Sequence, residues 1–211
     1  MKTNKLDMLL KIIFFGSIWG LLEATLGYVL HFVPALISGS VMFPIVLLIL
    51  YRAYKSLGSR KAIFYVAMVA IMIKSVNLLL PFLHPARTIN PMVSMFLEAG
   101  LIFAIIPMLE SDKPTLKVSG IVGASLVWRL AFVGYQGLNY MMTGFLATYL
   151  TSFSMAIRFI VLEGLAGTVL ALVAFLLLEK TVFMKKRELF KISPFLSFST
   201  LILAVILTLS L

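Results

Sequence analysis

The sequence contains no cysteine and few charged residues. Without cysteine the chain has no disulfide framework, no thiolate metal site and no cysteine nucleophile. Asp, Glu, Lys and Arg make up 12% of the 211 residues, well below the roughly 25% typical of soluble domains. Hydrophobic residues make up 62%, and the mean hydropathy is +1.09. These values exclude an ordinary soluble domain and predict an all-α, polytopic membrane protein.

Motifs for nucleotide binding and hydrolysis are also missing. The sequence has no Gly-x-Ser-x-Gly nucleophile motif and no Gly-x-x-x-x-Gly-Lys-Ser/Thr phosphate-binding loop. Its two histidines, His31 and His84, do not stand in a metal-binding spacing such as His-Glu-x-x-His. We therefore predict no metal site and no cofactor, and we do not expect the chain to hydrolyse ATP on its own.

Apolar runs are spread along the whole chain. A helix needs about 20 apolar residues to cross ~30 Å of hydrocarbon. The predicted spans are Met8–Val33, Ile37–Tyr51, Ala62–Leu83, Ile89–Leu109, Leu116–Leu138, Phe153–Leu178 and Pro194–Leu211. The second span is short and contains Pro44. We predict a six-helix membrane core over residues 1–190, followed by a hydrophobic C-terminal helix over residues 191–211 that forms a seventh span.

The basic residues indicate an orientation, because Lys and Arg are concentrated in cytoplasmic loops. If the N-terminus is cytoplasmic, the outer loops keep only Arg87. The cytoplasmic side then collects Lys2, Lys5, Lys11, Arg52, Lys55, Arg60, Lys61, Lys113, Lys117, Lys180, Lys185, Lys186, Arg187 and Lys191. This asymmetry predicts a multi-pass protein of the cell membrane with a cytoplasmic N-terminus. It explains the net charge of +10 better than nucleic-acid binding does.

Six ionisable residues fall inside the predicted spans, in the half nearer the outer surface. They are Glu23, Lys74, Glu98, Arg129, Arg158 and Glu163. A charge at bilayer depth costs about 2.5 to 3.5 kcal/mol on insertion scales, so such residues usually face a partner or a cavity. Three acids and three bases can also neutralise one another. The set therefore either binds a ligand or forms salt bridges that stabilise helix packing.

Polar residues recur at helical spacing on three of the spans. The stripes are Lys74, Asn77, Pro81 and His84, then Asn90, Ser94 and Glu98, then Ser125, Arg129, Phe132 and Gln136. Together with aromatic residues near the same end, they predict a small-molecule pocket in the outer half of the bilayer. The predicted substrate-binding residues are Glu23, Lys74, Asn77, Glu98, Trp128, Arg129, Gln136, Arg158 and Glu163. The uncharged segment Asn139–Ser152 is either a partly buried lid or an interfacial loop.

Small residues follow one face of the first span at Gly16, Gly20, Ala24 and Gly27. A second patch lies in the sixth span at Gly164, Gly167 and Ala171. Small residues at this spacing let helix backbones approach closely in lipid. Each patch therefore packs the chain's own helices or receives a partner subunit.

Residues 1–190 resemble the S component, the substrate-binding membrane subunit, of energy-coupling factor (ECF) type vitamin transporters. The resemblance rests on the six-helix core, the first-helix stripe "GSIWGLLEA", the basic cytoplasmic loops, and polar and aromatic residues beneath the outer loops. It implies a ligand held in the outer half and a coupling subunit, acting with ATPases, docked on Gly16, Gly20 and Ala24. The pocket residues it implies are Glu23, Lys74, Glu98, Arg129 and Arg158. The seventh span is a departure, since the family usually ends after six helices.

The favoured prediction is a membrane-embedded substrate-binding subunit for uptake of a small, vitamin-like metabolite. The charges suit a ligand with an anionic group and a cationic or hydrogen-bonding group, because Arg binds carboxylate or phosphate and Glu accepts from an amine. One alternative is an intramembrane enzyme acting on a lipid or isoprenoid. Its general base is Glu98 or Glu163, and Arg129 or Arg158 holds a phosphate. A second alternative is a structural subunit whose charges only bridge helices.

Overall fold

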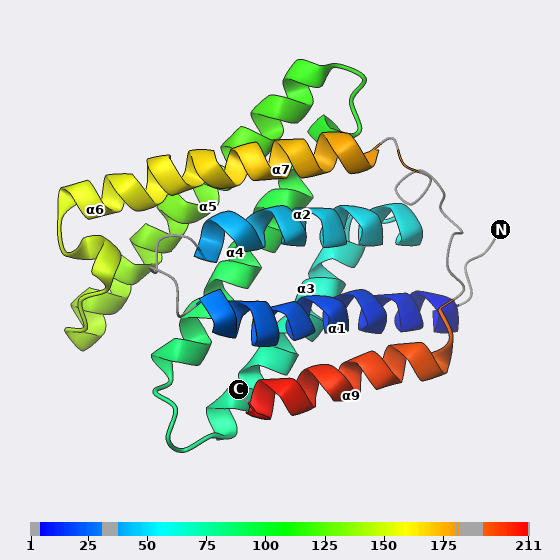
Figure 1. Ribbon diagram of the computed structural model, residues 1–211, viewed down its shortest axis with the longest axis horizontal. Helices are drawn as coiled ribbons and strands as arrows, with labels where there is room; N and C mark the ends of the chain where they lie inside the picture. The colour runs from blue at the N-terminus through cyan, green and yellow to red at the C-terminus, as the bar shows by residue number, and fades with distance from the viewer. Residues whose placement is uncertain (1–4, 31–37, 180, 182–191, 211) are drawn as a thin grey trace.

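The computed structural model is a helical bundle that describes residues 5–30, 38–179, 181 and 192–210. Over these residues it contains no β-strand. The main helices are α1 (Lys5–Leu30), α2 (Ser38–Leu57), α3 (Ala62–Ser75), α4 (Ala86–Leu109), α5 (Pro114–Thr143), α7 (Glu163–Glu179) and α9 (Pro194–Ser210) (Figure 1). The prediction of an all-α bundle is confirmed.

Six helical stretches of the described chain are long and apolar enough to cross a membrane. They are Lys5–Gly27, Gly39–Leu57, Ala62–Leu79, Ala86–Leu109, Pro114–Thr143 and Phe153–Glu179. The apolar helix α9 follows them and is shorter, at 17 residues. The predicted six long apolar helices and the added C-terminal helix are thus confirmed, whereas a seventh membrane span formed by α9 stays a prediction. The predicted division at residues 190 and 191 lies outside the described residues.

Glycine and proline mark the ends of α2 and α5. Gly58 follows α2 with φ of 67°, and Gly144 follows α5 with φ of 71°, a left-handed conformation that stops a helix and favours glycine. Pro114 opens α5, where its missing N–H is not needed. As a result α5 continues beyond the predicted end at Leu138 and includes the first part of the predicted lid segment.

The sixth span is not a regular α-helix. It consists of α6 (Phe153–Ile157), the π-helical segment η3 (Arg158–Leu162) and α7. The Glu163 N–H donates to the Arg158 carbonyl, five residues back instead of four. A π-turn changes the direction of the side chains before it relative to those after it, and such turns are frequent at functional sites.

The small-residue stripe of α1 packs against α3. A Cβ added at Gly16 would lie 2.6 Å from Val69 Cβ, and one at Gly20 would lie 2.9 Å from Ile73 Cδ1. The two backbones can approach only because these side chains are absent. This face of α1 is therefore covered within the chain, and docking of a partner on Gly16, Gly20 and Ala24 stays a prediction.

Helix α9 packs along α1 and runs in the same direction (Figure 1). The Ser197 hydroxyl joins the two helices near their starts by donating to the Leu10 carbonyl at 3.0 Å. We call the end of the bundle where α1 begins the proximal end, and the end where α1 finishes the distal end. Three ion pairs lie towards the proximal end, whereas the distal end contains a cavity.

Candidate ligand-binding pocket

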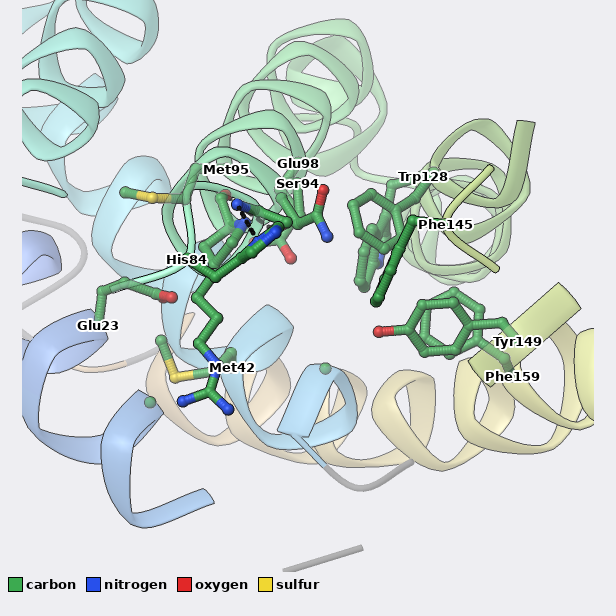
Figure 2. A pocket seen from close by; sticks show the side chains of 17 residues that line it. Glu23, Met42, His84, Ser94, Met95, Glu98, Trp128, Phe145, Tyr149 and Phe159 are labelled. Carbon is green, nitrogen blue, oxygen red and sulfur yellow. Dashed lines mark hydrogen bonds between the residues drawn. The ribbon is translucent and has the colours of Figure 1, made fainter. Parts of the chain in front are cut away.

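A cavity of about 490 Å³ opens at the distal end of the bundle (Figure 2). Its size falls within the roughly 300 to 1,000 Å³ of small-molecule sites. The lining residues are Glu23, Gly27, Gly39, Met42, His84, Ala86, Arg87, Asn90, Pro91, Ser94, Met95, Glu98, Trp128, Phe132, Phe145, Tyr149 and Phe159. They come from α1, α2, α4, α5, η3 and two connecting segments, so several elements that meet at the distal end form the cavity together.

One wall of the cavity is aromatic. The Tyr149 and Phe159 rings have centroids 4.5 Å apart, and Phe132 lies 6.0 Å from Tyr149. Trp128 meets Phe159 edge to face at 6.1 Å. Edge-to-face and offset ring pairs at these distances are favourable. The four rings, which we call the aromatic wall, therefore form a continuous apolar surface.

Two connecting segments meet beside the cavity. Phe145, which follows α5, stacks on His84, which precedes α4, with ring centroids 6.3 Å apart. Tyr149 lies in the short 3-10 helix η2 (Thr148–Leu150). Burial, and to a smaller extent Glu163, raises the pKa of the Tyr149 phenol, so this hydroxyl stays protonated at neutral pH. The segment predicted as a lid thus contributes two aromatic side chains to the cavity.

The opposite side of the cavity is acidic. Glu98 follows Asn90 and Ser94 on one face of α4, and all three line the cavity. Glu23 reaches it from α1, and Figure 2 shows this side chain across from Tyr149 and Phe159. Glu23 and Glu98 lie within electrostatic range of each other. Neither carboxylate forms a hydrogen bond or an ion pair within the described part of the chain.

A second charged cluster is buried beside the cavity. Arg129 is fully buried, and its Nη1 donates to the Ser125 carbonyl and hydroxyl oxygens at 2.8 and 3.1 Å. Its guanidinium lies 4.6 Å from the Trp128 ring centroid. Among the described residues, the Arg129 Nε and Nη2 and both Glu163 carboxylate oxygens have no hydrogen-bond partner. Arg129 is within electrostatic range of Glu98 and Glu163, yet neither acid comes within the 4.0 Å of an ion pair.

Gly167 leaves room for the Arg129 guanidinium, and Gly39 leaves room chiefly for the Trp128 ring, which an added Cβ would approach to 3.2 Å. A Cβ added at Gly167 would lie 3.2 Å from Arg129 Nη2, and one added at Gly39 would lie 3.5 Å from the same atom. Hydrogen bonds hold the surrounding helices: the Ser40 hydroxyl donates to the Glu163 carbonyl, and the Ser125 hydroxyl to the Gly164 carbonyl, both at 2.9 Å. The second small-residue patch therefore packs α7 against α2 and α5.

The structure brings only part of the predicted substrate-binding set to the cavity. Glu23, Glu98 and Trp128 line it, while Arg129 and Glu163 are buried beside it and do not line it. The other four do not line it either: Lys74 is half-buried and within electrostatic range of Glu23, Asn77 and Gln136 are buried, and Arg158 is exposed. His31 lies outside the described residues.

Several lining residues were not predicted as substrate-binding. Arg87 stood out as the basic residue of the predicted outer loops, and Tyr149 belonged to the predicted lid segment, so both had a sequence signal. Phe159 had none, because it follows directly after Arg158 and enters the cavity from a π-helical turn that hydrophobic periodicity does not show.

No group of three or more His, Asp or Glu side chains that could hold a metal ion occurs among the described residues.

Comparisons of the chain with protein-family models, with curated proteins and with solved structures gave no match.

Proposed function

We propose that this chain is the membrane-embedded substrate-binding subunit of a transporter that takes up a small, vitamin-like metabolite. The observation that carries the proposal is the distal cavity, where the unpaired carboxylates of Glu23 and Glu98 face an aromatic wall. A concave, mainly apolar site with a few converging polar groups is the usual form of a small-molecule site. Ionisable residues within a membrane bundle are also, by default, functional candidates.

A purely structural role for these acids has less support. Charges retained for packing are expected to pair, because an unpaired buried charge is strongly unfavourable. Glu98 is only 5% exposed, lines a cavity, and has no ion-pair partner within the described residues. A ligand that supplies the missing partner explains this arrangement.

In the proposed transport cycle, the ligand enters through the distal end. With the N-terminus in the cytoplasm, that end faces outward, so the cavity takes its ligand from outside the cell. A separate transmembrane coupling subunit and ATPases then drive release to the cytoplasm. The proposal includes these partners because the chain has no phosphate-binding loop of its own.

The alternative of an enzyme acting on a lipid or isoprenoid has weaker support. Glu98 lies in the cavity, where a general base is needed. The two bases assigned to hold a phosphate are not placed for it, since Arg129 is buried without lining the cavity and Arg158 is exposed. Arg87 is the arginine that lines the cavity.

Native mass spectrometry of the gently purified protein tests the proposal. We expect a water-soluble metabolite to co-elute with the wild-type chain. Phe145→Ala should reduce its retention, because this ring lines the cavity, whereas Leu146→Ala should not, because the neighbouring exposed side chain does not line it.

Two outcomes would overturn the proposal. A retained lipid that the purified protein converts to product would favour the enzyme. A chain that is repeatedly empty and shows no thermal shift across a panel of metabolites would remove the basis for a binding subunit.

A further inference from the structure

We infer that the cavity selects a ligand with a cationic nitrogen at one end and a flat aromatic ring at the other. The inference rests on the proposed function, because it assumes that the distal cavity is a ligand site. It names the chemical class of ligand, which the proposed function leaves open.

The acidic side defines the cationic end of the ligand. Glu23 and Glu98 both line the cavity, and they lie within electrostatic range of each other. The bases within electrostatic range, Lys74 for Glu23 and Arg129 for Glu98, are not lining residues and form no ion pair with them. An ammonium or a protonated ring nitrogen between the carboxylates would relieve the repulsion and form charge-assisted hydrogen bonds.

The aromatic wall defines the other end. Phe132, Phe159 and Trp128 are buried, and with Tyr149 they form one surface on which a planar ring can stack. Met42 and Met95 add apolar, adaptable contacts to the lining. A ligand with an apolar plane is therefore expected to bury it on this side.

Arg129 disfavours a ligand cation against the aromatic wall. Its guanidinium already contacts the Trp128 ring from outside the cavity, 4.6 Å from the ring centroid, and also lies 5.9 Å from the Phe159 centroid. A second positive charge against the same rings would be repelled. The ligand's cation is therefore expected at Glu23 and Glu98, and its ring at the aromatic wall.

The other ionisable side chains that line the cavity do not neutralise the negative charge of the acidic side. Arg87 and His84 are exposed and belong to the connecting segment and the start of α4. Solvent screens an exposed charge more strongly than a buried one. An anionic substituent on the ligand can therefore be accepted near Arg87, while the buried end of the cavity still requires a cation.

Four small probes separate the contribution of the ligand's charge to the binding affinity from the contribution of its aromatic ring. Tryptamine carries a cation and an indole, indole-3-acetate an anion and the same ring, tryptophol a neutral hydroxyl and the same ring, and propylamine a cation without a ring. We expect isothermal titration calorimetry at neutral pH to give the tightest binding for tryptamine. A charge-assisted hydrogen bond is worth about tenfold or more in affinity, so indole-3-acetate should bind at least that much more weakly. Propylamine should also bind more weakly, because it has no ring to stack on the aromatic wall.

Variants test whether the preference for a cationic ligand depends on Glu98 and Glu23. Glu98→Gln should weaken tryptamine binding by about tenfold or more, because it removes the charge but keeps the shape, and tryptophol binding should change little. Glu23→Gln provides a second test at a less buried position if Glu98→Gln does not fold. The control is Asp112→Asn, an exposed acid between α4 and α5 that does not line the cavity, and it should leave both affinities unchanged.

The inference is overturned if indole-3-acetate binds as tightly as tryptamine, if both Gln variants retain full tryptamine affinity, or if tryptamine does not bind. Each of these results leaves the proposed function standing when native mass spectrometry still finds a water-soluble metabolite. A chain that binds neither the probes nor any metabolite overturns both.

Discussion

The two ends of the bundle treat charge in opposite ways. Towards the proximal end Lys55 contacts Glu110 at 3.0 Å, Lys11 contacts Asp7 at 2.8 Å, and Lys117 pairs with Glu179. At the distal end the acids are as numerous but none has an ion-pair partner within the described residues. Those acids are Glu23, Glu98 and Glu163.

The difference indicates that the two ends have different roles, helix packing at the proximal end and the proposed ligand binding at the distal end. Two of the proximal pairs link neighbouring helices, that of Lys55 between α2 and the end of α4 and that of Lys117 between α5 and α7. Within the described part of the chain, the distal end leaves polar atoms of Arg129 and Glu163 buried without hydrogen-bond partners, which is unfavourable by about 1 to 3 kcal/mol for each group. The proximal end therefore contributes favourable charge pairs, whereas the distal end is not optimised for stability, as expected for a binding site.

The largest effect is expected from Arg129→Met. The variant removes two hydrogen bonds from a fully buried guanidinium to Ser125 and its contact with the Trp128 ring. It also removes the positive charge within electrostatic range of Glu98 and Glu163, so the loss should be the largest of the three. The free energy of unfolding in detergent micelles, from a denaturant titration, measures the loss. Adding Glu163→Gln should restore part of it, and a single variant as stable as wild type would show that the distal charges do not depend on one another.

A smaller effect is expected from Tyr51→Phe at the proximal end. The Tyr51 hydroxyl donates to Glu110 Oε1 at 2.7 Å, and a hydrogen bond to a charged group contributes about 1.5 to 3 kcal/mol. The same titration should show a loss in this range with the slope of the transition unchanged. Tyr54→Phe is the matched control, because no hydrogen bond from its hydroxyl occurs in the described structure. Equal losses in the two variants would contradict the prediction.

The smallest effect is expected from Lys55→Met. Its ion pair with Glu110 is partly exposed, and such pairs contribute about 0.2 to 1 kcal/mol. Raising the salt concentration to about 1 M shortens the screening length to about 3 Å and should reduce even this difference. A loss as large as that of Arg129→Met would overturn the distinction between the two ends.

The sequence predicts best where the helices are regular. Asn90, Ser94 and Glu98 are spaced by four residues, and because α4 is α-helical over that stretch, all three face the cavity. Adjacent residues point about 100° apart on a helix. Trp128 therefore lines the cavity while Arg129 is buried beside it, a distinction that residue type alone does not make.

Prediction is weaker where the helical period changes. After Ser75 the third span continues as the 3-10 helix η1 (Val76–Leu79), so an α-helical stripe drawn from Lys74 to Asn77 and His84 does not keep one face. The π-helical turn has the same consequence for Arg158, which is exposed, and for Phe159, which enters the cavity. Single-sequence periodicity assumes one period, and these two turns depart from it.

The close approach of Gly39 and Gly167 to the Arg129 guanidinium also has a consequence for how the sequence can change. A methyl group added at Gly167 would meet both the end of the arginine and the Ser40 backbone at 3.2 Å, whereas one added at Gly39 would first meet the Trp128 ring at 3.2 Å. Substitutions at positions 129 and 167 should be strongly non-additive. A larger residue at position 167 therefore needs both a shorter residue at position 129 and a shift of the α2 backbone at Ser40. The packing of α2 against α7 thus depends on the size of the charged side chain beside the pocket.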